Sequence, residues 1–257
     1  MQFVKVAPRR LRRETTFKIQ MQISDRQKNI LDTIIREYVE SARPVSSQYL
    51  GERYDFGICP ASIRIEMQKL TDDGFLCQPH TSAGRVPTDK GYRLFVDKLL
   101  ESDNPPTGGL DFDPAKSMEE EFEDIFKLAN SLTRSLAQAS SSLVLGYLRR
   151  EDVLWKEGWE DLLQNPEFGQ RDLIDNFIDY LGYMEDSVKN RSADLQIDIH
   201  IGTENRFPKA QEFSAITFAL QPGDQEEVIL SIVGPKRMAY ERNIALTNEI
   251  LKMFNEI

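Results

Sequence analysis

A short segment rich in turn-forming residues, Pro79–Arg93, limits the fold of this chain more narrowly than any other. Its sequence, PHTSAGRVPTDKGYR, places a glycine at the expected tip of a β-hairpin, where we expect Gly84 to adopt positive φ. Val86 then favours extended backbone, because the residue before a proline avoids the helical region. Thr88 is suited to cap a helix that follows. The segment therefore predicts a hairpin closed by a helix.

Three helical patterns precede this hairpin. Ser24 and Gln27 form a capping-box pair at the start of the first helix. Ser46 is placed to cap the second, and Pro60 fits the first position of a third that ends near Gly74. Three helices, a hairpin and a closing helix follow one another in the order of a winged-helix DNA-binding domain.

The third helix has one apolar and one mixed side. Ile63, Met67 and Leu70 recur at helical spacing and predict the buried side. A helix in the major groove needs short residues, an arginine, an amide and an apolar group for thymine methyls. The mixed side offers all of these: Ala61, Ser62, Arg64, Ile65, Gln68 and Lys69. For Arg64 and Lys69, a solvated helix face is the alternative.

Further candidate DNA contacts flank the third helix. Hydroxyl and free N–H groups at the start of the second helix can meet a phosphate, and Ser46 can also serve as a cap. An arginine beside the hairpin tip can reach a phosphate or a narrow minor groove. The candidates are Ser46, Ser47, Gln48, His80, Thr81, Arg85 and, in the closing helix, Lys90.

Charge is unevenly distributed along the chain, whose net charge is -10. Residues 1–100 carry 17 Lys and Arg against 12 Asp and Glu, whereas residues 101–257 carry 15 against 30. Residues 1–22 alone hold six of the cations and one acid, so residues 23–100 balance at 11 against 11. A DNA-binding surface must therefore come from cations gathered on one face, because bulk charge does not supply it.

The patterns predict an α+β protein with five regions. A linker is expected where proline, glycine and aspartate cluster in ESDNPPTGGLDFDP. The regions are a disordered basic extension (1–22), a winged-helix domain (23–100), the linker (101–114), a helical dimerisation region (115–190) and a small α+β region (191–257). An internal start at Met21 is an equal alternative to a translated extension.

A seam of period 3.5 follows the linker. Apolar residues are separated alternately by four and three positions: Met118, Phe122, Ile125, Ala129, Leu132, Leu136, Ala139 and Leu143. This spacing is typical of coiled coils, so we expect a long helix, ending near Arg150, that forms a homodimer. A helix packed on its own domain is the alternative.

The remaining chain mixes helix and strand. Arg171–Val188 predicts a helix, whereas Leu195–Ile201 alternates apolar and polar residues as a half-buried strand does. Ser214–Leu220 and Val228–Val233 predict two further strands, and Met238–Ile257 predicts a final helix. We therefore expect a small sheet in this region.

No sequence pattern indicates catalysis, a cofactor or a metal site. The two cysteines lack CxxC spacing, the two histidines lie far apart, and no phosphate-binding glycine loop or nucleophile elbow is present. The sequence contains no run of about 18 apolar residues, which a membrane-spanning helix would need. The expected protein is cytoplasmic and is not an enzyme.

Five segments together resemble the heat-inducible transcription repressor HrcA family. They are SDRQKNIL, EYVESARPVSSQYL, PASIRIEMQKLTDDGFLCQPHTSAGRVPTDKGYRLFVDKL, EGWEDLLQNPEF and IVGPKRMAYERNIAL. The resemblance implies a homodimeric repressor that binds an inverted-repeat operator in double-stranded DNA ahead of chaperone genes, with the chaperonin GroEL promoting its active form. It also implies a winged helix, a GAF-like domain and an inserted dimerising domain.

Two departures from the family pattern modify this expectation. Ile65 replaces the asparagine of the family's A-T-I-R-N-E-M pattern, so the operator sequence can differ. The family also carries many more residues before EGWEDLLQNPEF, so we expect a truncated GAF-like domain here. Two other functions stay open: a winged-helix protein-interaction module, and a ligand-sensing regulator without the chaperone-operon target.

Overall fold

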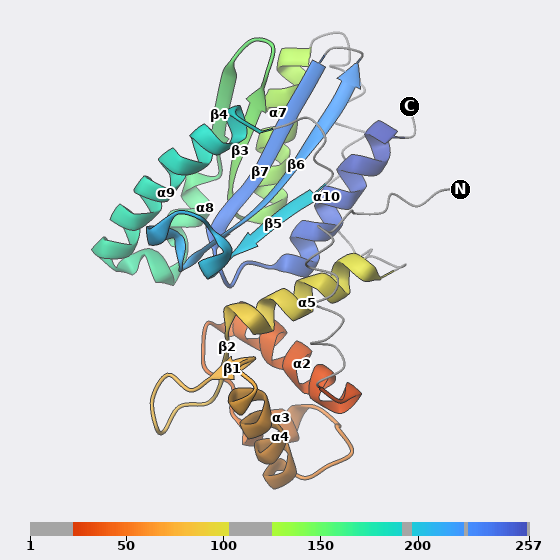
Figure 1. The fold of residues 1–257 in the computed structure, drawn as a ribbon, viewed down its shortest axis with the longest axis vertical. Helices are drawn as coiled ribbons and strands as arrows, with labels where there is room; N and C mark the ends of the chain where they lie inside the picture. Colours follow the sequence, from red (N-terminus) through yellow and green to blue (C-terminus); the bar gives the residue numbers. More distant parts are fainter. Residues whose placement is uncertain (1–22, 103–124, 192–196, 224–225, 256–257) are drawn as a thin grey trace. The chain divides into compact units, whose positions relative to one another are not determined.

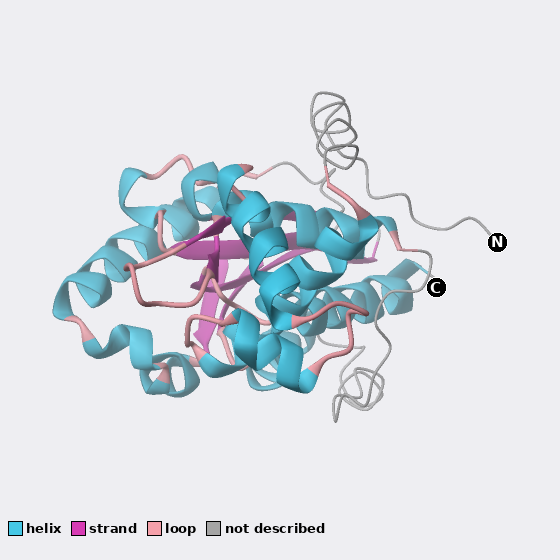
Figure 2. Ribbon diagram, turned by 90° about the horizontal axis from the view of Figure 1, so that it is seen from below, coloured by secondary structure: helices cyan, strands magenta, loops and turns pink. Residues whose placement is uncertain are grey.

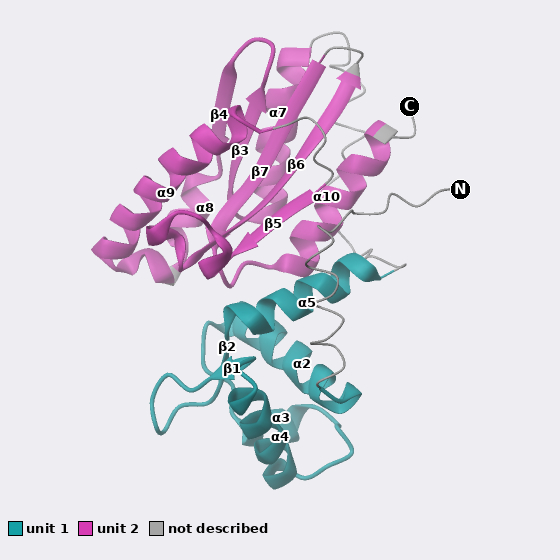
Figure 3. Cartoon of the chain, in the orientation of Figure 1, with its two compact units in different colours: residues 1–102 teal, residues 103–257 magenta. Residues whose placement is uncertain are grey.

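The computed structural model of this protein describes residues 23–102, 125–191, 197–223 and 226–255. It divides the chain into two compact units, residues 1–102 and residues 103–257 (Figure 3). The predicted extension at 1–22, nearly all of the predicted linker, and the seam residues Met118 and Phe122 lie outside the described residues.

Unit 1 contains the helices and the hairpin in the predicted order (Figure 1). Its elements are α2 (Asp25–Ser41), α3 (Ser47–Arg53), α4 (Pro60–Asp72), β1 (Leu76–Cys77), β2 (Val86–Pro87) and α5 (Asp89–Glu101). The Ser24 and Gln27 capping box is present, and the Thr88 hydroxyl accepts a hydrogen bond from the Gly91 N–H at 3.2 Å. The caps predicted from the sequence therefore set both helix starts.

The prediction that Gly84 has positive φ is wrong. The positive-φ glycine of this region is Gly74, which ends the turn after α4. Gly84 instead lies against another part of the backbone, because a Cβ atom there would stand 2.3 Å from the Val45 carbonyl oxygen. The hairpin requires glycine at this position for close backbone approach rather than for chain reversal.

Unit 2 is built on a five-stranded antiparallel sheet in the order β4-β3-β7-β6-β5. The strands are β3 (Leu143–Leu148), β4 (Val153–Glu157), β5 (Ile197–Ile201), β6 (Phe213–Gly223) and β7 (Glu226–Pro235). The α-helices are α7 (Ile125–Ser140), α8 (Trp159–Gln164), α9 (Arg171–Lys189) and α10 (Tyr240–Asn255). The described part of unit 2 also contains the short 3-10 helices η1 (Pro166–Gly169), η2 (Gly202–Glu204) and η3 (Pro208–Ala210). Figure 2 shows the strands and the helices around them from a second direction.

Helices cover both faces of this sheet. Alternate residues of β3, such as Leu145 and Tyr147, share a buried cluster with Phe177 and Tyr180 of α9. The intervening Gly146 faces α7, where an added Cβ atom would stand 1.9 Å from the Thr133 hydroxyl oxygen. Since β3 lies inside the sheet, between β4 and β7, and is covered on both faces, every residue of this strand is buried.

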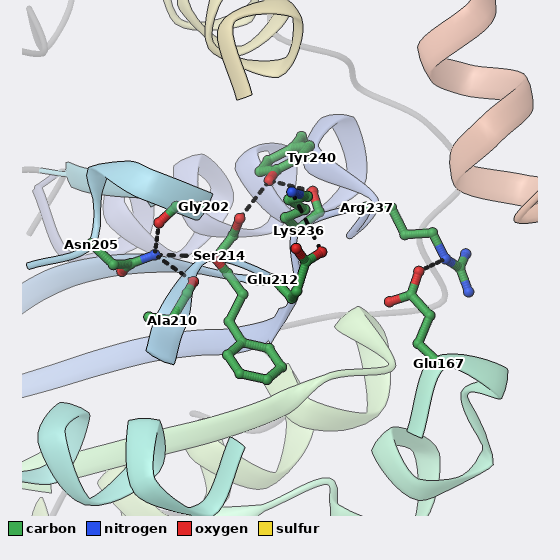
Figure 4. A network of polar contacts seen from close by, with 10 residues as sticks. Glu167, Gly202, Asn205, Ala210, Glu212, Ser214, Lys236, Arg237 and Tyr240 are labelled. Atoms are coloured by element: carbon green, nitrogen blue, oxygen red, sulfur yellow. Dashed lines mark hydrogen bonds and ion pairs between the residues drawn. The ribbon is translucent and has the colours of Figure 1, made fainter. Parts of the chain in front are cut away.

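Hydrogen bonds fasten the loops at one end of the sheet (Figure 4). The Asn205 amide donates to the carbonyl oxygens of Gly202 at 2.9 Å and Phe213 at 3.0 Å. The Tyr240 hydroxyl lies 2.8 Å from the Ser214 hydroxyl and donates to the Lys236 carbonyl oxygen at 2.6 Å. The bond between Tyr240 and Ser214 connects the start of α10 to β6, and the two bonds of Tyr240 satisfy the hydroxyl group of this buried side chain.

Most described residues of the predicted dimerisation seam pack within unit 2 itself. Ala129, Leu132 and Leu136 are fully buried within unit 2, on the side of α7 that packs against the sheet. The helix ends at Ser140, so Leu143 starts strand β3 and cannot continue a helical seam. Ile125 and Ala139 are partly exposed members of the same helix. The alternative of a helix packed on its own domain therefore holds.

The predicted end of this helix near Arg150 is also wrong, because β3 and β4 occupy residues that the prediction assigned to the helical region. The sheet is consequently larger than expected. The predicted regions 115–190 and 191–257 are not separate bodies, since α7, α9 and all five strands lie in one unit.

Candidate nucleic-acid interface

The exposed side of α4 is the candidate interface. Pro60 occupies the first turn of the helix, and Ile63, Met67 and Leu70 are buried at 0, 4 and 0% exposure, as the spacing predicts. The opposite side is exposed to solvent; we call it the outer face of α4, and it consists of Ala61, Arg64, Ile65, Gln68 and Lys69. Ser62 is half-buried beside it. Sequence spacing therefore identifies both sides of this helix correctly.

Arg85 connects the hairpin to the outer face of α4. Its Nη2 donates to the Gln68 Oε1 at 2.9 Å, and its Nε donates to the Thr71 hydroxyl at 3.0 Å. The Arg85 backbone also exchanges two hydrogen bonds with Val45, of 2.8 and 2.9 Å, just before α3. The guanidinium thus joins the hairpin to α4, and the backbone bonds of the same residue join the hairpin to the segment before α3.

The hairpin loop is organised by one glutamine. The Gln78 side-chain amide donates to the carbonyl oxygens of Thr81 and Ala83, both at 2.9 Å. The side chains of His80 and Thr81 are left exposed on this loop. Sequence reasoning did not single out Gln78, because its role depends on loop geometry and has no periodic signal.

Both candidate lysines, Lys69 and Lys90, form contacts within the protein. The Lys90 ammonium donates to the Asp73 carbonyl oxygen at 2.7 Å and lies 4.2 Å from the centroid of the Phe75 ring. A cation at the carboxyl end of α4 is favoured there by the helix dipole. Lys69 pairs with Glu66 at 3.0 Å, although its side chain remains 55% exposed. Direct DNA contact by either lysine stays a prediction.

The start of α3 contributes a cap and two polar side chains. The Ser46 hydroxyl accepts a hydrogen bond from the Tyr49 N–H at 3.1 Å, so the predicted capping role is confirmed. Gln48 is exposed and donates to Glu52 at 2.9 Å, while Ser47 is partly exposed. The Val45 bridge to Arg85 brings this helix start beside the hairpin.

A buried glutamate supports the position of α3 and was missed by the sequence analysis. Glu37 of α2 accepts hydrogen bonds from the hydroxyl groups of Tyr49 and Tyr54. These bonds, that from Tyr49 first, hold the pKa of Glu37 below its ordinary value of 4.5. The same contact with Glu37 raises the pKa of Tyr54 to about 12. Nothing in the spacing of these three residues along the chain signals their contact.

Among the described residues, no group of three or more His, Cys, Asp or Glu side chains is placed to hold a metal ion. Cys59 precedes α4, and hydrogen bonds lower the pKa of its thiol. The bond with the Ser62 hydroxyl has the largest effect, and backbone N–H groups add to it. Within the described parts of the chain, no helix has the length and apolar character that crossing a membrane requires.

Comparisons with known proteins match this chain to HrcA proteins. A family model described as "HrcA protein C terminal domain" matches residues 109–244. The heat-inducible transcription repressor HrcA of Alkaliphilus metalliredigens is 53% identical over 81 residues, which are 32% of this chain and 24% of that protein. This alignment of higher identity thus spans only about a quarter of the length of that relative.

Longer alignments have lower identity. The HrcA repressor of Caldanaerobacter subterraneus subsp. tengcongensis is 25% identical over 344 residues, with 92% of this chain and 98% of that protein covered. Since the alignment is longer than this chain of 257 residues, the relative contains segments without a counterpart here, which agrees with the predicted shortening. A crystal structure described as that of a hypothetical protein has a TM-score of 0.76 at 21% identity and covers 91% of this chain and 98% of its own, which shows the shared fold.

Proposed function

This chain belongs to the HrcA family of heat-inducible transcription repressors, and from this premise we propose that it is a sequence-specific repressor of chaperone genes. The proposed target is an inverted-repeat operator in double-stranded DNA, bound by a homodimer. Unit 1 acts as a winged helix in which α4 enters the major groove and the hairpin lies beside it as the wing.

The observation that carries the proposal is the outer face of α4. It combines a short residue, an exposed arginine and an exposed aliphatic group on a helix whose other side is fully packed. Ala61 permits close approach to the DNA, and Arg64 can donate to a guanine or to a phosphate. The hairpin and the start of α3, joined through Arg85 and Val45, flank this helix with groups suited to phosphate contact.

The homodimer is proposed without the seam on α7. Two symmetric copies would set their α4 helices about 34–36 Å apart, or a multiple of this distance, to face successive major grooves. Because Leu132 and Leu136 of α7 are packed within unit 2, the proposed interface uses other residues of the chain. GroEL as a partner that promotes the active form stays a prediction from the family resemblance.

Selection from random double-stranded DNA by the full chain tests the proposal. The selected duplex and a scrambled duplex are then titrated across salt concentrations by fluorescence anisotropy. We expect an enriched inverted repeat, bound more tightly than the scrambled duplex, with an affinity that falls steeply as salt rises. A folded protein that enriches no sequence would contradict the proposal.

A protein-interaction module is the second candidate, and one observation favours it. Arg85 and Lys90 are engaged within unit 1, whereas Ile65 is 57% exposed on the outer face of α4. An exposed aliphatic residue on a rigid helix can also anchor a partner protein. This candidate predicts no enriched sequence in the selection, so the same experiment separates the two functions.

A further inference from the structure

Gln68, on the outer face of α4, already uses its side-chain carbonyl and amide groups in hydrogen bonds within the protein. Gln68 accepts from the Arg85 guanidinium through its carbonyl oxygen at 2.9 Å and donates to the Asp72 carboxylate through its amide nitrogen at 2.8 Å. A glutamine that reads adenine must offer both of these groups to the base. Base recognition by Gln68 would therefore require it to release both partners.

Ile65 occupies the same face and is the unusual residue of the helix. It is 57% exposed, equal to Leu163 as the most exposed large apolar side chain among the described residues. Helix propensity does not favour isoleucine at an exposed helical position, because a side chain branched at Cβ loses χ1 freedom in a helix. Ala61 stands one turn before it and Arg64 beside it, so a short side chain and a cation border the aliphatic group.

On the basis of the proposed function, we propose that Ile65 determines operator sequence by packing against the 5-methyl group of a thymine in each half-site. Thymine is the one standard base with a methyl group at the edge of the major groove. The contact removes apolar surface of both groups from water and needs no hydrogen-bond donor. Arg64, on the same face, supplies the polar part of the readout.

Replacement of thymine by deoxyuridine tests this contact directly, because deoxyuridine keeps every hydrogen-bonding group and lacks only the methyl group. Each thymine of the selected duplex is replaced in turn, symmetrically in both half-sites, and binding is measured by fluorescence anisotropy. At one position we expect binding of the unaltered chain to weaken about fourfold per half-site, the effect of one buried methyl group. Both half-sites together should give about fifteenfold.

Two variants assign the effect to Ile65. Ile65→Ala should bind the thymine and deoxyuridine duplexes with equal affinity at that position, whereas Arg64→Ala should bind both more weakly but keep their ratio. Because both residues are exposed, both variants should retain the thermal transition of the unaltered protein.

Three outcomes decide the matter. Equal binding of every deoxyuridine duplex by the unaltered chain would overturn the inference, as would a full thymine preference retained by Ile65→Ala. In both of these cases the selected duplex still binds more tightly than the scrambled one, so the repressor function stands. If no duplex binds more tightly than scrambled DNA, the proposed function fails, and this inference fails with it.

Discussion

Helices α4 and α7 both carry a regular apolar stripe, and the structure uses the two stripes in the same way. Ile63, Met67 and Leu70 of α4 pack into unit 1, while Leu132 and Leu136 of α7 pack into unit 2. The helices differ on their other sides. The outer face of α4 presents short, cationic and apolar groups beside a hairpin. The other side of α7 is mostly polar, and its exposed Phe126 packs edge-on against Trp155 of the same unit at 4.9 Å between ring centroids.

This difference shows which side of a helix indicates that it binds a partner. A stripe at helical spacing indicates that a helix packs against something, and its own domain satisfies that requirement first. An exposed apolar residue opposite the stripe, such as Ile65, is not explained by the domain's own core. It is therefore the outer face of α4, and not the stripe of α7, that indicates binding of a partner.

The largest expected effect concerns α7. Leu132→Ala should lower the free energy of unfolding of unit 2 by about 2–5 kcal/mol, because it leaves a cavity between the helix and the sheet. Both tryptophans of the chain, Trp155 and Trp159, lie in unit 2, so denaturant unfolding followed by tryptophan fluorescence measures this unit.

Gln138→Ala, on the exposed side of the same helix, is the matched control and should change stability by less than about 0.5 kcal/mol. Light scattering supplies the second readout. A Leu132→Ala protein that keeps its stability but changes from dimer to monomer would restore the seam on α7 as the dimer interface and would remove the contrast between the two helices.

An intermediate effect is expected on α4. Arg64→Ala should reduce the preference for the selected duplex over the scrambled one by about 1–3 kcal/mol, since a base contact is lost. Arg26→Ala removes an exposed arginine from α2 and should leave that preference unchanged. If Arg64→Ala weakens binding to both duplexes evenly, the arginine binds phosphate instead, and base readout by the outer face of α4 depends on Ile65.

The smallest effect concerns the support of α3 within unit 1. Glu37→Gln should cost about 1 kcal/mol at pH 7, because a charged acceptor for two tyrosine hydroxyls is lost. Since the folded-state pKa of Glu37 is lowered below 4.5, its contribution is present above pH 4.5 and is lost as the pH falls through the folded-state value. The variant and the unaltered protein should therefore converge in acid.

Thermal melts by far-UV circular dichroism at pH 7 and in acid measure this difference, because unit 1 contributes signal that tryptophan fluorescence does not follow. Glu40→Gln, at an exposed position of α2, is the control and should show no such pH dependence. A constant difference between Glu37→Gln and the unaltered protein at every pH would show that the charge of Glu37 contributes nothing.

The elements of unit 1 were predictable because local signals determine them. Caps at Ser24 and Thr88 and the proline that opens α4 act within a few residues of where they stand. The contacts of Arg85 were not predictable, because its partners lie 14 and 17 residues away and depend on how the hairpin folds onto α4. The same holds for Gly84, which is required by the distant backbone of Val45.

The misplaced helix end in unit 2 has a physical origin. Strand β3 is buried on both faces, so its sequence LVLGYL lacks the alternation of a half-buried strand and continues the apolar pattern of the preceding helix. Periodicity alone cannot separate a helix from such a strand. The predicted seam therefore extended to Leu143, three residues beyond the end of α7.

Methylation protection of guanine N7 on the selected duplex shows whether the outer face of α4 enters the major groove in two symmetric copies. Guanine N7 lies in the major groove, so a bound helix shields it. We expect protected guanines in both half-sites, with centres about 34–36 Å or a multiple of this apart, and loss of this protection in Arg64→Ala. Protection at a single site, or protection unchanged by Arg64→Ala and Ile65→Ala together, would contradict this expectation.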